Sequence, residues 1–371
     1  MEYQRFVKRF VTINFSIIVV IFAISLILLD IYKENYSDNE IVQNYENVLY
    51  GSALEDGALL KLDIVQTKKP KVVTLGSSRV MQFRADFFNN RDFYTLGGLG
   101  ASVDEVAFAW DMIQKSYIPD VTIIGIDPWW LNPNYKQENR WLNVSTTQYS
   151  KYVILYKDTK ILKQIFNTRE IKDTDPISGL KNIGLNAAVK GNGYRLSDGS
   201  YQYGKEINDK EDNTTRFKST YERMEKGAVE DRFVWCDSIS DYELKKLHDL
   251  LLQIKNSGTT VIVFLPPFPH EVYNYMDNSI HFHDYLHAYM LETEKMCANL
   301  DIPWYNFTDL ASTGGSDDET IDGFHGSEVA YARITYLLGK NKTLVNYVDN
   351  EKIEYAINHP IDNFQAIPPL K

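Results

Sequence analysis

The sequence predicts a three-layer α/β/α domain built on a mostly parallel sheet and preceded by one transmembrane helix. Short aliphatic runs, such as Val72–Leu75 and Val121–Ile126, alternate with segments of helical spacing, such as Val103–Ile113. This alternation is typical of a parallel sheet that is covered on both faces. A segment near the N-terminus, Phe10–Leu29, is apolar and uncharged. The 371 residues suffice for one large domain with an insertion, or for two small domains.

The apolar segment Phe10–Leu29 has the length of a membrane-spanning helix. Its twenty residues would rise about 30 Å as an α-helix, which is the thickness of a bilayer core. Basic residues precede it, and Asp30 and Glu34 follow it. The positive-inside rule therefore places the N-terminus in the cytoplasm and the main domain outside, in the periplasm or on the outer face of the cell membrane. A cleaved signal peptide is the alternative, but residues 25–30 offer no small-residue cleavage site, so we favour an uncleaved anchor over residues 1–31.

The remaining segments follow in chain order. Residues 32–70 are polar and rich in tyrosine, which suggests a stalk between the membrane and the domain. The domain is expected over 71–345, with an inserted subdomain at about 134–235, and 346–371 form a C-terminal extension. The expected strands are 72–75, 93–96, 121–126, 261–265 and 302–307, and the expected helices are 103–113, 241–255, 286–300 and 329–338.

The inserted subdomain interrupts the alternation of strands and helices. It contains several glycines and the turn Ser197-Asp198-Gly199, which lies between aromatic residues and predicts a β-hairpin. Such an insertion forms a lid, a docking surface or a structural decoration, and the sequence does not choose among the three.

A candidate nucleophile lies where the first strand of the sheet ends. Gly76-Ser77-Ser78 follows Val72–Leu75 and precedes Val80–Phe88, which we expect to continue as a helix. A hydroxyl group there lies at the carboxyl edge of a parallel sheet, beside backbone N–H groups that favour a developing oxyanion. Ser78 is therefore the candidate nucleophile. The alternative is a serine that only caps the helix.

Candidate partners for Ser78 lie near the other end of the chain. Asp322 and His325 are three residues apart, on a loop beyond the last expected strand. This spacing lets the carboxylate hold one imidazole nitrogen while the other nitrogen faces a serine, as in a Ser-His-Asp triad. The strand order returns this pair to the edge where Ser78 lies. His270 follows the strand 261–265 at the same edge and is a further candidate for lining the site.

These motifs resemble the conserved blocks of the SGNH (GDSL-type) hydrolase superfamily. Gly76-Ser77-Ser78 resembles the first block, with Ser77 in the place of the usual aspartate, and Asp322-Gly-Phe-His325 resembles the last block. Leu96–Ser102 resembles the second block. The resemblance implies a flavodoxin-like sheet, and it implies that the N–H groups of Gly100 and Ser78 form the oxyanion hole.

The third block differs from the common pattern. Pro128-Trp129-Trp130-Leu131-Asn132 stands where ordinary members have Gly-x-Asn-Asp, which leaves Asn132 as the substitute donor. The segment is closer to that of DltD-like proteins, the membrane-anchored proteins of lipoteichoic acid D-alanylation. We expect one of the two tryptophans to pack in the core and the other to face the cleft, with two core tryptophans as the alternative.

The resemblance implies a serine esterase or O-acyltransferase that acts on acyl esters of a cell-surface polysaccharide or a teichoic acid-like polymer. A multi-span membrane O-acyltransferase is the implied partner. The hypothesis from another class is a catalytically weak SGNH-fold scaffold or binding partner of that acyltransferase. The missing asparagine of the third block supports the scaffold, whereas retention of the serine, histidine and aspartate opposes it.

Composition bears on the remaining functional classes. With 39 basic and 50 acidic residues the formal charge is −11, which argues against nucleic acid as a partner. No cofactor is expected. His281, His283 and His287 cluster without an accompanying carboxylate motif, so no metal site is predicted. Cys236 and Cys297 form either one disulfide, in an oxidising compartment, or two buried thiols.

Overall fold

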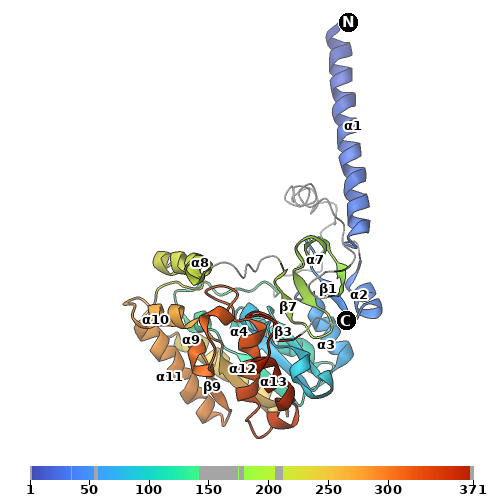
Figure 1. The fold of residues 1–371 in the computed structure, drawn as a ribbon. Coiled ribbons are helices and arrows are strands. Elements are labelled where there is room, and N and C mark those ends of the chain that lie inside the picture. Colours follow the sequence, from blue (N-terminus) through green and yellow to red (C-terminus); the bar gives the residue numbers. More distant parts are fainter. Residues whose placement is uncertain are drawn as a thin grey trace.

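The computed structural model describes residues 2–34, 36–53, 57–141, 174, 179–204 and 212–367. Its first element, the helix α1 (Glu2–Ile31), extends away from the rest of the protein (Figure 1). Among the described residues α1 is the one helix that is long and apolar enough to cross a membrane. This property rests on length and composition, which a signal sequence near an N-terminus shares.

The central sheet has five parallel strands in the order β3-β2-β4-β8-β9. Numbered along the chain, this is the order 2-1-3-4-5 of flavodoxin-like folds, in which ligands bind at the carboxyl ends of the strands. All five strands coincide with expected ones, although the last is shorter than expected. Their bounds are β2 Val72–Gly76, β3 Phe93–Gly97, β4 Val121–Gly125, β8 Thr260–Leu265 and β9 Trp304–Asn306.

Helices cover both faces of this sheet, which confirms the predicted layers (Figure 1). Alternate residues of β8 point to opposite faces: Val261 and Val263 belong to one buried cluster, and Ile262 and Phe264 belong to the other. The first cluster is closed by α3 (Leu60–Lys68), α4 (Val103–Gln114), α9 (Asp241–Asn256), α10 (His270–Asp277) and α11 (His283–Asn299). The second is closed by α12 (Glu328–Leu338) and α13 (Asn350–Asn358).

The C-terminal extension is therefore part of the domain. Ile353 and Ala356 of α13 are buried against the same sheet face as α12. The apolar spacing of α13 explains this, because a helix with one apolar face must bury that face.

A second, smaller sheet joins two segments that are distant in the sequence. Its strands are β1 (Val48–Tyr50), β5 (Lys181–Ile183), β6 (Gly193–Arg195) and β7 (Tyr201–Gln202), in the order β5-β1-β6-β7. The pairing of β6 with β7 is antiparallel, which confirms the predicted hairpin in the insertion. Gly199 in its turn has φ +74°, a conformation that favours glycine. Other parts of the insertion lie outside the described residues.

The stalk expected over 32–70 is corrected by this sheet. Val48–Tyr50 is a short buried apolar strand that pairs with β5 on one side and β6 on the other. The same segment also forms α2 (Asp38–Asn44) and α3, which packs on α4. Apolar residues among the tyrosines supply this folded structure, so most of the segment belongs to the globular body. The insertion also contributes α7 (Leu185–Lys190) and α8 (Asn213–Lys226).

Buried ion pairs fasten the hairpin to the main domain. Arg84 Nε lies 3.1 Å from Asp198 Oδ2 in the hairpin turn, and Arg84 Nη1 lies 2.7 Å from Glu328 Oε1 at the start of α12. Arg195 of β6 reaches the same Glu328 oxygen at 2.9 Å. Charges that leave water remain ionised when they are paired in this way. The network fixes the hairpin beside the carboxyl edge of the central sheet.

Candidate active site

Ser78, His325 and Asp322 form a continuous hydrogen-bonded chain at the carboxyl edge of the central sheet. Ser78 Oγ lies 2.9 Å from His325 Nε2. His325 Nδ1 lies 3.0 Å and 3.1 Å from the two carboxylate oxygens of Asp322. The imidazole thus has one nitrogen on the carboxylate and the other on the hydroxyl, which is the arrangement that activates a serine for attack. The structure brings these three sequence-predicted residues together.

Short connecting segments, rather than long helices, hold the three side chains. Ser78 begins a single 3₁₀ turn, Ser78–Val80, directly after β2. The helix expected over Val80–Phe88 is not formed: this described segment contains only the end of that turn and a second short 3₁₀ turn, Ala85–Phe87, with Val80 and Phe83 buried and Arg84 directed toward Asp198. The macrodipole argument for Ser78 therefore loses its basis, and the site rests on the triad geometry.

The charge of Asp322 is matched to its role. Desolvation by the surrounding protein would raise the pKa of this carboxyl group, but the ion pair with His325 and hydrogen bonds from the backbone N–H groups of Phe324 and His325 lower it further than desolvation raises it. Both N–H groups donate to Oδ1 at 2.7 Å. Asp322 is therefore held as a carboxylate that can stabilise an imidazolium on His325.

The predicted oxyanion donor Gly100 is engaged elsewhere. Its N–H donates to the carbonyl oxygen of Gly76 at 2.9 Å, and the N–H of Gly98 donates to the same oxygen at 3.2 Å. A Cβ atom on Gly100 would lie 2.4 Å from the side chain of Val106 in α4, so the glycine allows this loop to pack closely against the start of that helix. The N–H of Ser78, at the start of its 3₁₀ turn, is a donor without an acceptor within that turn.

A cavity of about 320 Å³ opens beside Ser78 and His325. Its wall combines backbone at Gly98 and Ala101 with aromatic and basic side chains from the insertion and its flanks. The lining residues are Ser78, Met81, Gly98, Ala101, Arg140, Tyr194, Tyr201, Tyr203, Arg232 and His325. A neighbouring cavity of about 270 Å³ shares Tyr201 and Tyr203 with it.

Tyr203 is an aromatic residue of the cavity wall that lies beside His325. Its ring centre lies 5.9 Å from that of His325, and its ring also contacts Tyr201. Within the described part of the chain its shielded hydroxyl group has no hydrogen-bond partner. Burial raises the pKa of Tyr203 well above its ordinary value, so the hydroxyl stays protonated.

Two guanidinium groups on the cavity wall are each paired with a carboxylate. Arg140 Nη2 lies 2.9 Å from Glu105 Oε2 and also donates to the carbonyl oxygen of Gly98 at 2.9 Å. Arg232 Nη2 lies 2.8 Å from Glu138 Oε1. These pairs orient the guanidinium groups and balance their charge in the protein without substrate.

Arg79 joins the separate loops of the site from behind. Its guanidinium carbon lies 3.8 Å from the ring centre of Phe268, after β8, and 5.2 Å from that of Phe324, next to His325. It pairs with Asp127, after β4, and donates to the carbonyl oxygen of Pro266 at 2.8 Å. Burial raises the pKa of Asp127, against the opposing influence of Arg79.

The third-block candidates lie outside the cavity wall. Trp129 and Trp130 are 1% and 0% exposed, so the expectation that one faces the cleft is corrected: both are core residues. Trp129 donates to the carbonyl oxygen of Ala101 at 2.9 Å and stacks on Phe324. The buried Asn132 donates to the carbonyl oxygen of Val234 at 2.9 Å, which ties the end of the insertion to the domain.

His270 also lies outside the cavity wall. His270 begins α10 and contacts Asp309 and Asn274, and it is absent from the described lining of the cavity.

Cys236 and Cys297 are buried free thiols, and burial raises the pKa of Cys297 to about 12. Of the two alternatives, a disulfide or two buried thiols, the structure therefore has two buried thiols.

Sequence reasoning missed the residues that surround the triad. Arg79 directly follows Ser78, and a buried cation beside a turn leaves no periodic signal in a sequence. The tyrosines were visible as aromatic residues around the turn at 197–199, but their position over the triad depends on the pairing of distant strands.

Comparison of the sequence with protein-family models and with curated proteins gave no match. What the fold and the site define is a class: an α/β protein with a parallel 2-1-3-4-5 sheet that carries a Ser-His-Asp constellation at the carboxyl edge.

Proposed function

We propose that the protein is a membrane-anchored serine esterase or O-acyltransferase of the SGNH type. The hydrogen-bonded chain from Ser78 through His325 to Asp322 is the observation that carries this proposal. The proposed substrates are acyl esters of a cell-surface polysaccharide or a teichoic acid-like polymer.

The geometry supports a covalent mechanism. Ser78 Oγ gives its proton to His325 Nε2 while it attacks the carbonyl carbon of the ester, and Asp322 stabilises the imidazolium that forms. The oxyanion develops near the N–H of Ser78. The departing alcohol takes the proton from His325 and leaves an ester on Ser78. Water or a polymer hydroxyl, deprotonated by His325, then attacks the acyl carbon, the bond to Ser78 Oγ breaks, and His325 returns the proton to Ser78.

The walls of the cavity support a polymeric, oxygen-rich substrate. The faces of Tyr194, Tyr201 and Tyr203 suit stacking on sugar rings, and Arg140 and Arg232 suit phosphate or carboxylate groups. The neighbouring cavity shares two of these tyrosines, so the combined site is longer than a single ester group.

The N-terminal helix supports a location at the membrane. Basic residues precede the apolar segment Phe10–Leu29 of α1 and acidic residues follow it, so the proposed orientation has the N-terminus in the cytoplasm and the catalytic domain outside. A multi-span membrane O-acyltransferase that delivers the acyl group is the proposed partner.

The geometry of the oxyanion site favours one other candidate function. Gly100 N–H is engaged by Gly76, and Asn132 is engaged by Val234, so two donors implied by the SGNH resemblance are committed elsewhere. This observation favours a catalytically weak scaffold or binding partner of the acyltransferase.

Labelling with a fluorophosphonate distinguishes the two functions. The full chain in detergent should be labelled at Ser78, and Ser78→Ala should abolish the label. His325→Ala and the Ser78→Ala/His325→Ala double change should reduce ester hydrolysis by similar, non-additive amounts, because the triad acts as a unit. Ser77→Ala, which removes the side chain that caps the same turn by accepting from the N–H of Arg79, should be less damaging than Ser78→Ala, and equal damage would contradict the choice of Ser78 as nucleophile. A folded protein that is inert toward several probes and simple esters would favour the scaffold.

A further inference from the structure

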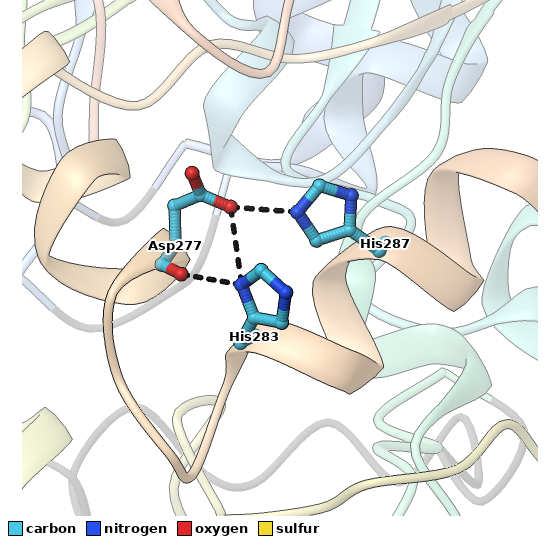
Figure 2. Close-up of side chains that lie close together, drawn as sticks. All are labelled: Asp277, His283 and His287. Carbon is cyan, nitrogen blue, oxygen red and sulfur yellow. Dashed lines mark hydrogen bonds and ion pairs between the residues drawn. The ribbon is translucent and has the colours of Figure 1, made fainter.

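Three potential metal ligands converge between α10 and α11, away from the catalytic cavity. Figure 2 shows Asp277, His283 and His287 with their side chains directed toward one another. Asp277 Oδ1 lies 2.7 Å from His287 Nε2 and 3.5 Å from His283 Nδ1, and His283 Nδ1 also lies 2.5 Å from the backbone carbonyl oxygen of Asp277 (Figure 2). All three potential ligand atoms lie within 4.8 Å of one another. None of the three residues belongs to the described lining of the cavity beside Ser78.

The fold fixes this arrangement. Asp277 is the last residue of α10 and His283 is the first residue of α11. His287 follows His283 by four residues, so both imidazoles lie on one face of α11; their ring centres are 4.5 Å apart. The carboxylate that the histidine-rich segment lacks in its own pattern is thus supplied by the preceding helix.

The spacing of the ligand atoms fits a small divalent ion. Four ligands at about 2.0–2.1 Å from tetrahedral zinc lie roughly 3.3 Å from one another. The 3.5 Å between Asp277 Oδ1 and His283 Nδ1 is close to this value. The 2.7 Å between Asp277 Oδ1 and His287 Nε2 would lengthen by about half an ångström when the ion binds. An ion would take the place of the proton between His287 Nε2 and the Asp277 carboxylate, and it would replace the hydrogen bond between His283 Nδ1 and the backbone carbonyl of Asp277.

The chemistry and accessibility of the three ligands favour a late first-row ion. Imidazole nitrogen suits zinc, copper and nickel, whereas magnesium and calcium prefer an all-oxygen set. The side chains of Asp277, His283 and His287 are 31%, 50% and 50% exposed, so an ion has an open path from solvent. Three protein ligands leave at least one position for water.

We propose that Asp277, His283 and His287 form a zinc-binding site that clamps α10 to α11. The loop between the helices carries His281, whose ring stacks on Trp235 at 3.7 Å between centres. Trp235 ends the insertion and accepts a hydrogen bond from Asn134. A bound ion would therefore also fix the contact between this loop and the inserted segment. The site is independent of the proposed acyl chemistry.

Zinc titration of the full chain, purified in detergent without a histidine tag and stripped with a chelator, tests the site. Calorimetry should give one equivalent of zinc, and cobalt as a probe should give the visible absorption of a site with nitrogen ligands. His287→Ala and the shape-conserving Asp277→Asn should each weaken zinc binding at least about tenfold, since loss of even an outer partner of a metal ligand typically costs 10–100-fold.

His248→Ala is the matched control, because His248 is another half-exposed histidine paired with an aspartate, Asp249, on a helix. This variant should bind zinc like the parent protein. Magnesium at the same concentration should give no binding heat. Circular dichroism of the apo-variants establishes that they are folded. Absence of zinc binding by the parent protein, or equal binding by the parent and by folded His287→Ala and Asp277→Asn, would overturn the proposal.

Discussion

Arg79 and Asp127 form an ion pair that is almost completely withdrawn from water, directly behind the turn that carries Ser78. The distance from Nη1 to Oδ1 is 3.0 Å, and the two side chains are 1% and 0% exposed. The pair spans the ends of β2 and β4, and the hydroxyl of Tyr331 in α12 donates to the carbonyl oxygen of Arg79. The position of Ser78 thus depends on a buried charge pair and on packing from both sides of the sheet.

Removal of one member of this pair should destabilise the protein strongly. Arg79→Met leaves Asp127 buried without its cation, which should lower the free energy of unfolding by about 3–5 kcal/mol. Denaturant unfolding in detergent, followed by tryptophan fluorescence, measures this loss. Arg79→Met/Asp127→Leu should recover much of the stability but little of the activity. Lys245→Met, in an exposed pair with Asp249, should cost less than about 1 kcal/mol. An equally small loss for Arg79→Met would contradict the assigned role.

The buried network around Arg84 should make stability depend on acid. Desolvation would raise the pKa of Asp198, but Arg84, Arg195 and hydrogen bonds from Ser200 lower it to about 2. Because the folded pKa lies below the unfolded value of about 3.9, the stabilisation is complete above that value and is lost as pH falls toward 2. Its size is about 2–3 kcal/mol.

Asp198→Asn tests this dependence. The difference in unfolding free energy between the parent protein and the variant should be largest at pH 7. It should shrink as the pH falls from 5 to 2. Asp301→Asn serves as the control, because Asp301 is fully exposed and its pair with Lys255 is 3.7 Å apart. A difference for Asp198→Asn that does not change with pH would show that the carboxylate charge contributes nothing.

The anchor hypothesis predicts the behaviour of the protein in membranes. With α1 inserted, the protein should keep its N-terminal residues and remain in the membrane fraction after a high-salt wash, because screening charge does not release about twenty apolar residues from a bilayer. N-terminal sequencing and immunoblotting of the fractions measure this. A soluble form that begins near Asp30 would instead identify α1 as a cleaved signal.

The central sheet was predictable because its signals are local. Runs such as Val121–Ile126 are apolar, short and bounded by turn residues, so period and length identify them as buried strands. The triad was predictable for a related reason: parallel strands end at one edge, so residues placed after strands meet there.

The features that the sequence did not predict depend mostly on contacts between distant segments. Val48–Tyr50 forms a strand only because β5 and β6, more than a hundred residues away, pair with it. The N–H of Gly100 is engaged because the Gly76 carbonyl lies within reach, which no spacing in the sequence reveals. Trp129 and Trp130 are both in the core because the 3₁₀ turn Pro128–Leu131 does not alternate its side chains as a strand does.

Trp129 should matter for stability rather than for the choice of acyl acceptor. Its ring is buried, stacks on Phe324 at 5.3 Å between centres, and supports Arg232. Trp129→Ala should cost about 3–5 kcal/mol of unfolding free energy. Transfer to polymer and hydrolysis of a small ester should fall together, which parallel assays and thermal unfolding would establish. A changed ratio of the two activities at unchanged stability would contradict a purely core role.

Tyr203 should instead control that ratio, because its ring lies beside His325 in the cavity wall. An aromatic ring at this position excludes water from an acyl group on Ser78. Tyr203→Ala should therefore lower polymer transfer relative to small-ester hydrolysis several-fold, whereas Tyr203→Phe, which keeps the ring and removes only the hydroxyl, should preserve the ratio. The measurement is the partition of a radiolabelled acyl donor between polymer and free acid, with fluorophosphonate labelling of Ser78 to show that each variant retains a formed site. If Tyr203→Ala and Tyr203→Phe shift the ratio equally, the hydroxyl and not the ring is responsible. If neither variant changes the ratio of transfer to hydrolysis, Tyr203 does not shield an acyl group on Ser78 from water. Hydrolysis would then be the favoured reaction.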